Sequence, residues 1–134
     1  MAKMIFVNLP VKDLDASKAF YKALGYTQNT QFSDETTASF EISDTIVVML
    51  LTEEKFGQFS TRPVADTHAT AGAIIALSAE SREEADRLTE TALSSGGRKA
   101  QEPMDMGFMY GRSFLDPDGH HWELVYMDPA ALES

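Results

Sequence analysis

The sequence predicts an α+β fold built from two βαβββ modules, and three observations lead to this prediction. The first half has the pattern of a strand, a helix and three further strands. The second half starts again with a strand and a helix. A shift of the sequence by 68 residues places 6–9 on 74–77 and moves the first predicted helix cap, Asp13, onto the second, Ser81. Coincident strands and caps favour a duplicated unit, although few residues are identical.

The first module, about residues 1–55, has clear signals at both ends of its helix. Residues 5–11 are mostly apolar and β-prone, which predicts a strand. Apolar residues then recur at helical spacing after Asp13, which can cap the helix, and Gly25 suits the left-handed residue that ends one. Polar turn residues separate three more short predicted strands, at 27–32, 36–42 and 46–52.

A connecting loop, about residues 56–70, and a second module, about 71–134, complete a single predicted domain over 1–134. A strand is expected at 73–79, and Ser81 with Glu84 forms a capping box for a helix that ends at two glycines, 96 and 97. Further strands are expected at 98–100, 109–115 and 122–127. The turn Asp116-Pro117-Asp118-Gly119 joins the last two.

The composition is that of an acidic globular domain. The chain has 134 residues, of which 43% are hydrophobic and 24% charged, so it has enough apolar surface for a core. Its 11 Lys and Arg against 21 Asp and Glu leave a formal net charge of −10, which repels phosphate backbones and argues against a nucleic-acid partner. The absence of cysteine excludes disulfides, thiolate nucleophiles and cysteine-ligated metals.

The apolar segments of the sequence are short. The first residues lack the long apolar stretch of a signal peptide, and the longest fully apolar run, 46–51, is too short to span a bilayer. We therefore expect a cytoplasmic location and no membrane partner.

Two segments carry a resemblance to a known superfamily. Residues 11–26, with their Phe-Tyr and Leu-Gly pairs, and residues 116–124, Asp-Pro-Asp-Gly-His-His-Trp-Glu-Leu, resemble the vicinal oxygen chelate superfamily. Its members include glyoxalase I, extradiol dioxygenases, and fosfomycin- and bleomycin-resistance proteins. Residues 6–10 and 48–51 look like a bacterial branch of predicted lactoylglutathione lyases. The resemblance covers nearly the whole chain and implies that both modules curl a mixed sheet into one cup, with the helices outside, in a homodimer.

The metal-dependent members of that superfamily take their ligands from the first and last strands of each module. The corresponding positions here are Phe6, Leu50, Ile74 and Glu123, of which only Glu123 can bind a metal. A catalytic divalent site needs about three protein ligands and an open position. The resemblance therefore implies neither the usual metal site nor any other cofactor. A non-standard set of His68, His121 and Glu123 is a weaker alternative, because no ligand-like spacing surrounds His68.

Strand alternation places His121 and Glu123 on one face of the last strand. In the resembling proteins that face lines the cup, and the same alternation places Phe6 and Asn8 inward. The expected lining is mainly apolar with a few polar groups, which suits a small organic ligand. Apolar surroundings disfavour a charged carboxylate and could prepare Glu123 to act as a general base. Alternatively, Glu123 is a relic of a ligand position, salt-bridged or hydrated.

Other side chains have two or more interpretations each. Arg112 could hold a substrate carboxylate through its planar guanidinium, or pair with a surface acid. The methionines at 104, 106 and 109 could form a lid, a dimer contact or part of the core. His120, within the turn, is expected to be exposed. The predicted substrate-binding residues are Phe6, Asn8, Leu50, Ile74, Tyr110, Arg112 and His121.

Two functions are therefore open, and the sequence does not decide whether the protein is an enzyme. The first is a glyoxalase-like lyase or isomerase in which Glu123 deprotonates a small substrate. The second is a binding protein like the bleomycin-resistance proteins, which would bind or sequester a cationic aromatic drug or metabolite. The missing metal ligands and the charge of −10 motivate the second, since acidic character attracts cations and aromatic side chains stack on flat rings. A third, weaker possibility is a module that regulates a partner.

Overall fold

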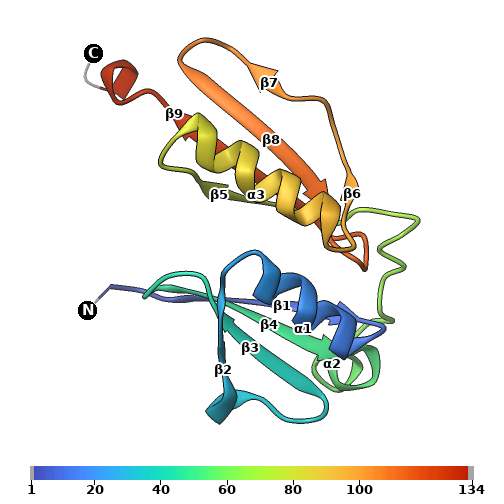
Figure 1. Cartoon of the computed structure of the whole chain (residues 1–134). Coiled ribbons are helices and arrows are strands. Elements are labelled where there is room, and N and C mark those ends of the chain that lie inside the picture. The colour runs from blue at the N-terminus through green and yellow to red at the C-terminus, as the bar shows by residue number, and fades with distance from the viewer. Residues whose placement is uncertain (1, 133–134) are drawn as a thin grey trace. The chain divides into compact units, whose positions relative to one another are not determined.

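The computed structural model describes residues 2–132 and divides into two compact units, Met1–Asp66 and Thr67–Ser134. The described residues form three α-helices and two mixed sheets, one sheet in each unit (Figure 1). Each unit has a strand and a helix followed by antiparallel strands. This arrangement confirms the predicted α+β fold with two βαβββ modules.

The first unit contains a four-stranded sheet in the order β1-β4-β3-β2. Its strands pair in parallel between β1 and β4 and antiparallel elsewhere. A 3₁₀ turn, η1, takes the place of the second half of the strand that we expected over 27–32. The elements are β1 (Ile5–Val11), α1 (Leu14–Ala23), β2 (Thr27–Asn29), η1 (Thr30–Phe32), β3 (Thr37–Glu41) and β4 (Ile46–Thr52).

The segment expected to be a loop over 56–70 is helical at its start. Helix α2 (Glu53–Phe59) follows β4 directly. The Thr52 side chain caps it by accepting a hydrogen bond from the Lys55 backbone N–H at 3.2 Å. Two glutamates in the first turn place negative charge at the positive end of the helix dipole, which stabilises the helix. These capping signals are local, but the segment lacks a regular apolar period, so the pattern alone did not predict the helix.

The second unit has the same parallel and antiparallel pairing. Its sheet order is β5-β9-β8-β6, with β5 parallel to β9, and a further short strand, β7, also pairs with β8. Strand β7 was not expected from the sequence. The elements are β5 (Ile74–Ser78), α3 (Arg82–Ser94), β6 (Arg98–Lys99), β7 (Met104–Asp105), β8 (Met109–Leu115), β9 (His121–Met127) and a short 3₁₀ helix, η2 (Pro129–Leu132).

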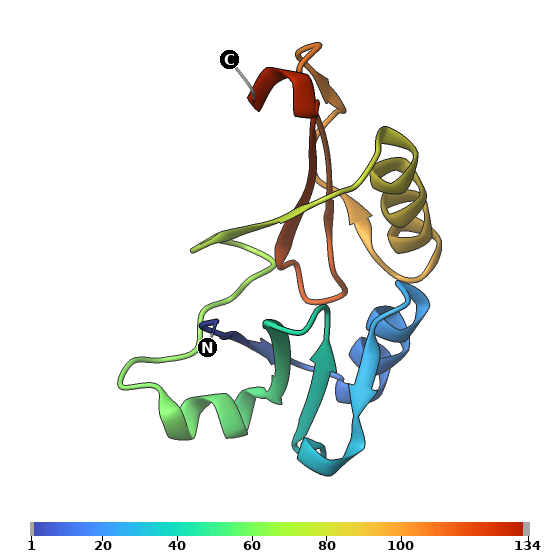
Figure 2. The same ribbon diagram turned by 90° about the vertical axis from the view of Figure 1, so that its left-hand side faces the viewer.

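One helix covers one face of each sheet and forms a core there. In the first unit, Phe20 and Tyr21 of α1 are buried and the Tyr21 ring lies 6.0 Å from that of Phe40 on β3. In the second unit, α3 packs small buried residues against β8 and β9, where Phe114 and Trp122 are each 2% exposed. Figure 2 shows the second sheet nearly edge-on, with α3 on one side of it. The first sheet also contacts a second helix of its unit, α2, through β1 and β4.

The predicted helix ends are confirmed at equivalent positions of the two modules. The Asp13 carboxylate accepts a hydrogen bond from the Ala16 backbone N–H at 3.1 Å, and the Ser81 hydroxyl accepts one from Glu84 N–H at 3.0 Å. The Glu84 carboxylate, however, accepts from the N–H of Glu80 and not from Ser81 as a full capping box requires. Within residues 2–132, no helix has the length and apolarity needed to cross a membrane.

Candidate functional site

The side of the first sheet that faces away from α1, here called the first open face, is defined by strand register. Phe6 lies beside Val47 and Asn8 beside Met49 across the parallel pair of β1 and β4. Ser39 and Glu41 of β3 lie opposite Met49 and Val47. Since neighbouring residues across a sheet point to the same side, these six side chains share one face.

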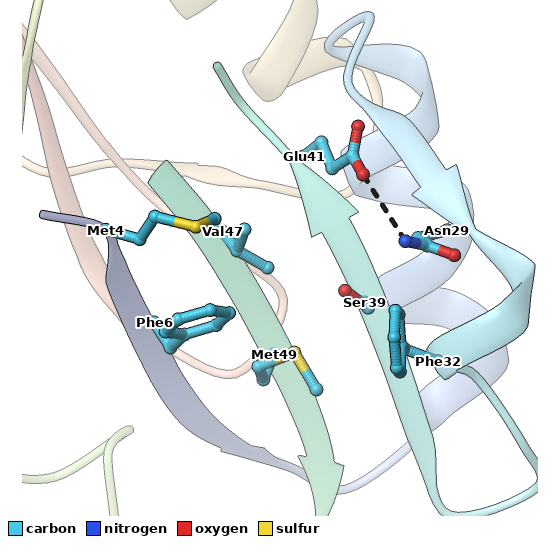
Figure 3. Close-up of a pocket in the computed structure, with 8 residues that line it drawn as sticks. All are labelled: Met4, Phe6, Asn29, Phe32, Ser39, Glu41, Val47 and Met49. Atoms are coloured by element: carbon cyan, nitrogen blue, oxygen red, sulfur yellow. Dashed lines mark hydrogen bonds between the residues drawn. The ribbon is translucent and has the colours of Figure 1, made fainter. Parts of the chain in front are cut away.

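A hollow of about 420 Å³ opens on this face. We call it the first-unit hollow, and Figure 3 draws its lining. Two aromatic side chains within it are largely exposed, Phe6 at 56% and Phe32 at 62%. Its volume falls within the range of about 300–1,000 Å³ that is typical of small-molecule sites. The lining residues are Met4, Phe6, Asn29, Phe32, Ser39, Glu41, Val47 and Met49.

Polar groups lie together on the β2 and β3 side of the first-unit hollow. The Asn29 side-chain amide donates a hydrogen bond to Glu41 Oε1 at 3.3 Å (Figure 3). The side-chain carbonyl oxygen of Asn29 accepts a hydrogen bond from the Gln31 backbone N–H at 3.1 Å, which caps the η1 turn that carries Phe32. Asn29 is therefore hydrogen-bonded both to the carboxylate and to the turn that holds one aromatic wall.

The second open face is the helix-free side of the second sheet, and it carries the predicted pair of His121 and Glu123. His121 Nε2 lies 3.8 Å from Glu123 Oε2, and the two side chains are 13% and 31% exposed. His121 Nε2 is buried without a hydrogen bond to the described residues. A space of about 40 Å³ beside Glu123, lined also by Ser113 and Met104, has room for a water-sized group.

The four positions that correspond to metal ligands do not fit a catalytic metal. Phe6 and Ile74 have no donor atom on their side chains, and Leu50 is fully buried on the α1 side of its sheet. Among residues 2–132, no group of three histidine or carboxylate side chains lies close enough to hold a metal ion, so His68, His121 and Glu123 do not form such a set. The donors around Glu123 thus fall short of the roughly three protein ligands of a catalytic centre.

The sheet register also corrects the equivalence between the modules. Ser39 pairs with Met49 in the first sheet, as Ser113 pairs with Glu123 in the second. Met49, and not Leu50, is therefore the counterpart of Glu123 on the first open face. The prediction for Leu50 was out by one residue, and in a strand one residue reverses the face.

Tyr110 and Arg112, two predicted substrate-binding residues, lie on the opposite side of the second sheet from Glu123. The Tyr110 hydroxyl donates to Asp86 Oδ1 at 2.5 Å, and Arg112 pairs with Asp86 at 2.6 Å and with Glu90 at 3.1 Å. The hydrogen bond from Tyr110 is the main cause that lowers the pKa of Asp86, and the same bond raises the pKa of Tyr110. We considered that Arg112 could hold a substrate carboxylate or pair with a surface acid, and in the structure it pairs with the acids Asp86 and Glu90.

The turn before β9 is more buried than expected. His120 is only 8% exposed, so the prediction that it is exposed was wrong. Asp116, fully buried, accepts hydrogen bonds from the backbone N–H groups of Asp118 and His120, both at 2.9 Å. The Thr67 hydroxyl donates to the Asp118 backbone oxygen at 2.5 Å. This turn packs against the start of the second unit, and from it β9 carries His121 and Glu123.

The methionine-rich segment before β8 lies at the surface. Met104, Met106 and Phe108 are 48%, 54% and 46% exposed, which excludes core packing for these three. Arg82 of α3 holds the segment by donating to both carboxylate oxygens of Asp105, at 2.9 and 3.1 Å, and to the Gly107 backbone oxygen at 2.9 Å.

The sequence predicted one of the residues that line the first-unit hollow and two that share a face with a candidate site. Phe6 was predicted and lines the first-unit hollow; Asn8 shares its face, and Ile74 shares a face with Glu123. The alternation of the apolar residues Ala38 and Phe40 with the polar residues Ser39 and Glu41 could have revealed the β3 contribution. The other missed lining residues are Met4, Asn29, Phe32, Val47 and Met49.

The family model of the Glyoxalase/Bleomycin resistance protein/Dioxygenase superfamily matches residues 3–124. A hypothetical protein from S. aureus has a similar structure with a TM-score of 0.79 and 30% identity, over 94% of each chain. No curated protein matches the chain in sequence.

Two further solved structures share the fold. A lactoylglutathione lyase from Agrobacterium tumefaciens has a TM-score of 0.70 and 16% identity, over 94% of each chain. A bleomycin resistance determinant encoded on the transposon Tn5 has a TM-score of 0.65 and 19% identity, over 95% of this chain and 99% of that one. At these identities the likeness extends to the fold alone.

Proposed function

Because the chain belongs to the Glyoxalase/Bleomycin resistance protein/Dioxygenase superfamily, we propose that it binds a small organic molecule in the first-unit hollow. The observation that carries this proposal is the volume of about 420 Å³ together with two largely exposed aromatic side chains. Covering apolar surface yields roughly 25 cal/mol for each Å² removed from water, so Phe6 and Phe32 favour an apolar occupant.

Titration with acridine, a flat and uncharged ring system in mildly alkaline buffer, tests the proposal. We expect saturable binding, and we expect Phe6→Ser to weaken it by about tenfold, because a partly buried aromatic contact contributes about 1.5 kcal/mol. Phe59→Ser is the matched control, since Phe59 on α2 is 71% exposed and lies outside the hollow. No binding of acridine at millimolar concentration, or equal weakening by both substitutions, would contradict the proposal.

A second candidate function is a lyase or isomerase reaction with Glu123 as the base. The proximity of Glu123 and His121, 3.8 Å apart on the second open face, favours it. A carboxylate can take a proton from the carbon beside a carbonyl, and a neighbouring imidazole can exchange a proton with the resulting oxygen. The similar fold of a lactoylglutathione lyase suggests the first substrate to assay.

The assay follows cleavage of lactoylglutathione in the wild type and in two variants. Glu123→Gln should remove turnover and leave the fold intact. Glu83→Gln, which removes an exposed glutamate at the start of α3, should retain it. Unchanged turnover in Glu123→Gln would exclude this role. The alternative is binding without chemistry, as we expect for a sequestering protein.

The proposal also includes an oligomeric state and a cellular location. We expect a homodimer in the cytoplasm. Light scattering on the purified protein measures the assembly, and a monomer at working concentration would contradict the dimer.

A further inference from the structure

We infer that Glu41 determines the specificity of the first-unit hollow, selecting flat ring compounds that carry a protonated nitrogen. This inference rests on the proposed binding function and names the chemical class of the ligand. Glu41 is the one charged side chain among the eight residues that line the hollow. A ligand in this hollow therefore meets apolar surface and a single negative charge.

Strand register determines where that charge lies. Glu41 is the last residue of β3 and pairs with Val47, so its side chain lies on the same face as Phe6 and Met49. Figure 3 shows the carboxylate near one end of the lining, with Phe6, Met49 and Phe32 further along the strands. A ring that covers the apolar side chains can thus direct a substituent toward Glu41.

The charge of Glu41 is held in place but not neutralised. Its hydrogen-bond donor is the uncharged amide of Asn29, 3.3 Å away. Across residues 2–132, Glu41 takes part in no ion pair. A carboxylate with one neutral donor retains oxygen lone pairs for a second donor, and a cationic one forms the stronger bond.

The contrast with other acids of the chain supports this role. Three acids of the second unit pair with arginines of the same unit, and these ion pairs compensate their negative charges. They are Asp86, Glu90 and Asp105. Glu41 instead lies beside exposed apolar surface. The formal charge of −10 adds a long-range attraction for cations, which salt screens within about 10 Å at 0.1 M.

Acridine and 9-aminoacridine make a matched pair of probes. They share one ring system, but in mildly alkaline buffer acridine is neutral and 9-aminoacridine is protonated. We expect the wild type to bind 9-aminoacridine about fivefold more tightly, the size of effect expected for a partly exposed ionic hydrogen bond. Glu41→Gln should abolish this preference and leave the affinity for acridine unchanged, which also reports that the variant is folded.

Glu35→Gln is the control for net charge. Glu35 lies in an exposed turn of the same unit and does not line the hollow, so its variant should keep the fivefold preference. If acridine binds but the wild type shows no preference, or if Glu41→Gln retains the preference, the inference is wrong and the proposed function stands. If neither probe binds, both fail.

Discussion

The turn that leads into β9 depends on Gly119, and Gly119→Ala should destabilise the protein strongly. Gly119 has a φ of +87°, a left-handed conformation that side chains disfavour. A Cβ at this position would overlap the backbone oxygen of Thr67 and lie 3.0 Å from its carbonyl carbon and 3.3 Å from the Cα of His68. These neighbours are backbone atoms, so no side-chain rotation relieves the overlap.

The magnitude follows from two contributions. The left-handed conformation costs an L-residue about 1–2 kcal/mol. Relief of the overlap must move the chain at Thr67, and the hydrogen bond from its hydroxyl to Asp118, worth about 1 kcal/mol, is then lost along with part of the local packing. We expect a loss of at least about 2–3 kcal/mol in the free energy of unfolding, which corresponds to a fall in Tm of about 7–11 °C.

Thermal and urea unfolding of three glycine variants separate these contributions. Gly25 has a φ of +95° and nothing within 4 Å of an added Cβ, so Gly25→Ala should cost about 1 kcal/mol. Gly72 lies in an exposed segment with open space around it, so Gly72→Ala should change stability by less than about 0.5 kcal/mol. A Gly119→Ala variant no less stable than Gly25→Ala would refute the reasoning from overlap.

Two further predictions concern α3. The hydroxyl of Thr89 is buried without a hydrogen bond to the described residues, so Thr89→Val should leave the free energy of unfolding unchanged or raise it by up to about 1 kcal/mol; a clear loss in urea unfolding would contradict this. Asp86→Asn removes the charge opposite Arg112, whose side chain is 14% exposed, and should cost about 1–2 kcal/mol at neutral pH. Hydrogen bonds from Tyr110 and Arg112 hold the pKa of Asp86 below its ordinary value of 3.8. The ionised Asp86 therefore contributes its full stabilisation to the fold above pH 3.8, and this contribution is lost as the pH falls through the lowered pKa. Acid unfolding curves should therefore show a smaller loss for Asp86→Asn than for the wild type below about pH 4, and parallel curves would count against the assignment.

Local signals were sufficient for the helices and strands that have them. Asp13 and Ser81 cap helices through hydrogen bonds to N–H groups three residues ahead, so a short stretch of sequence contains the whole interaction. Strands β4 and β8 have the bounds that their apolar patterns predict. The two-residue strand β7 has no such pattern, because it exists only through its pairing with β8.

The candidate site was less predictable, because side-chain direction depends on register. The expected alternation placed Phe6, His121 and Glu123 on the faces away from α1 and α3, as the structure does. Leu50 was assigned by correspondence with the metal-dependent members of the superfamily, and this assignment was out by one residue, which reverses the face. Arg112 could pair with many acids, and only the position of α3 over β8 selected Asp86 and Glu90.

The sequence by itself determined the module order, the helix caps and the family, because these depend on interactions among residues close in the chain or on motifs that can be read directly. The tertiary structure decided which residues share a surface. The first-unit hollow joins Met4 and Phe6 to Phe32, Glu41 and Met49, and these meet only because β1 pairs with β4 and β4 with β3. That pairing is set by the burial of the opposite face against α1, an energy summed over the whole unit and absent from any short segment.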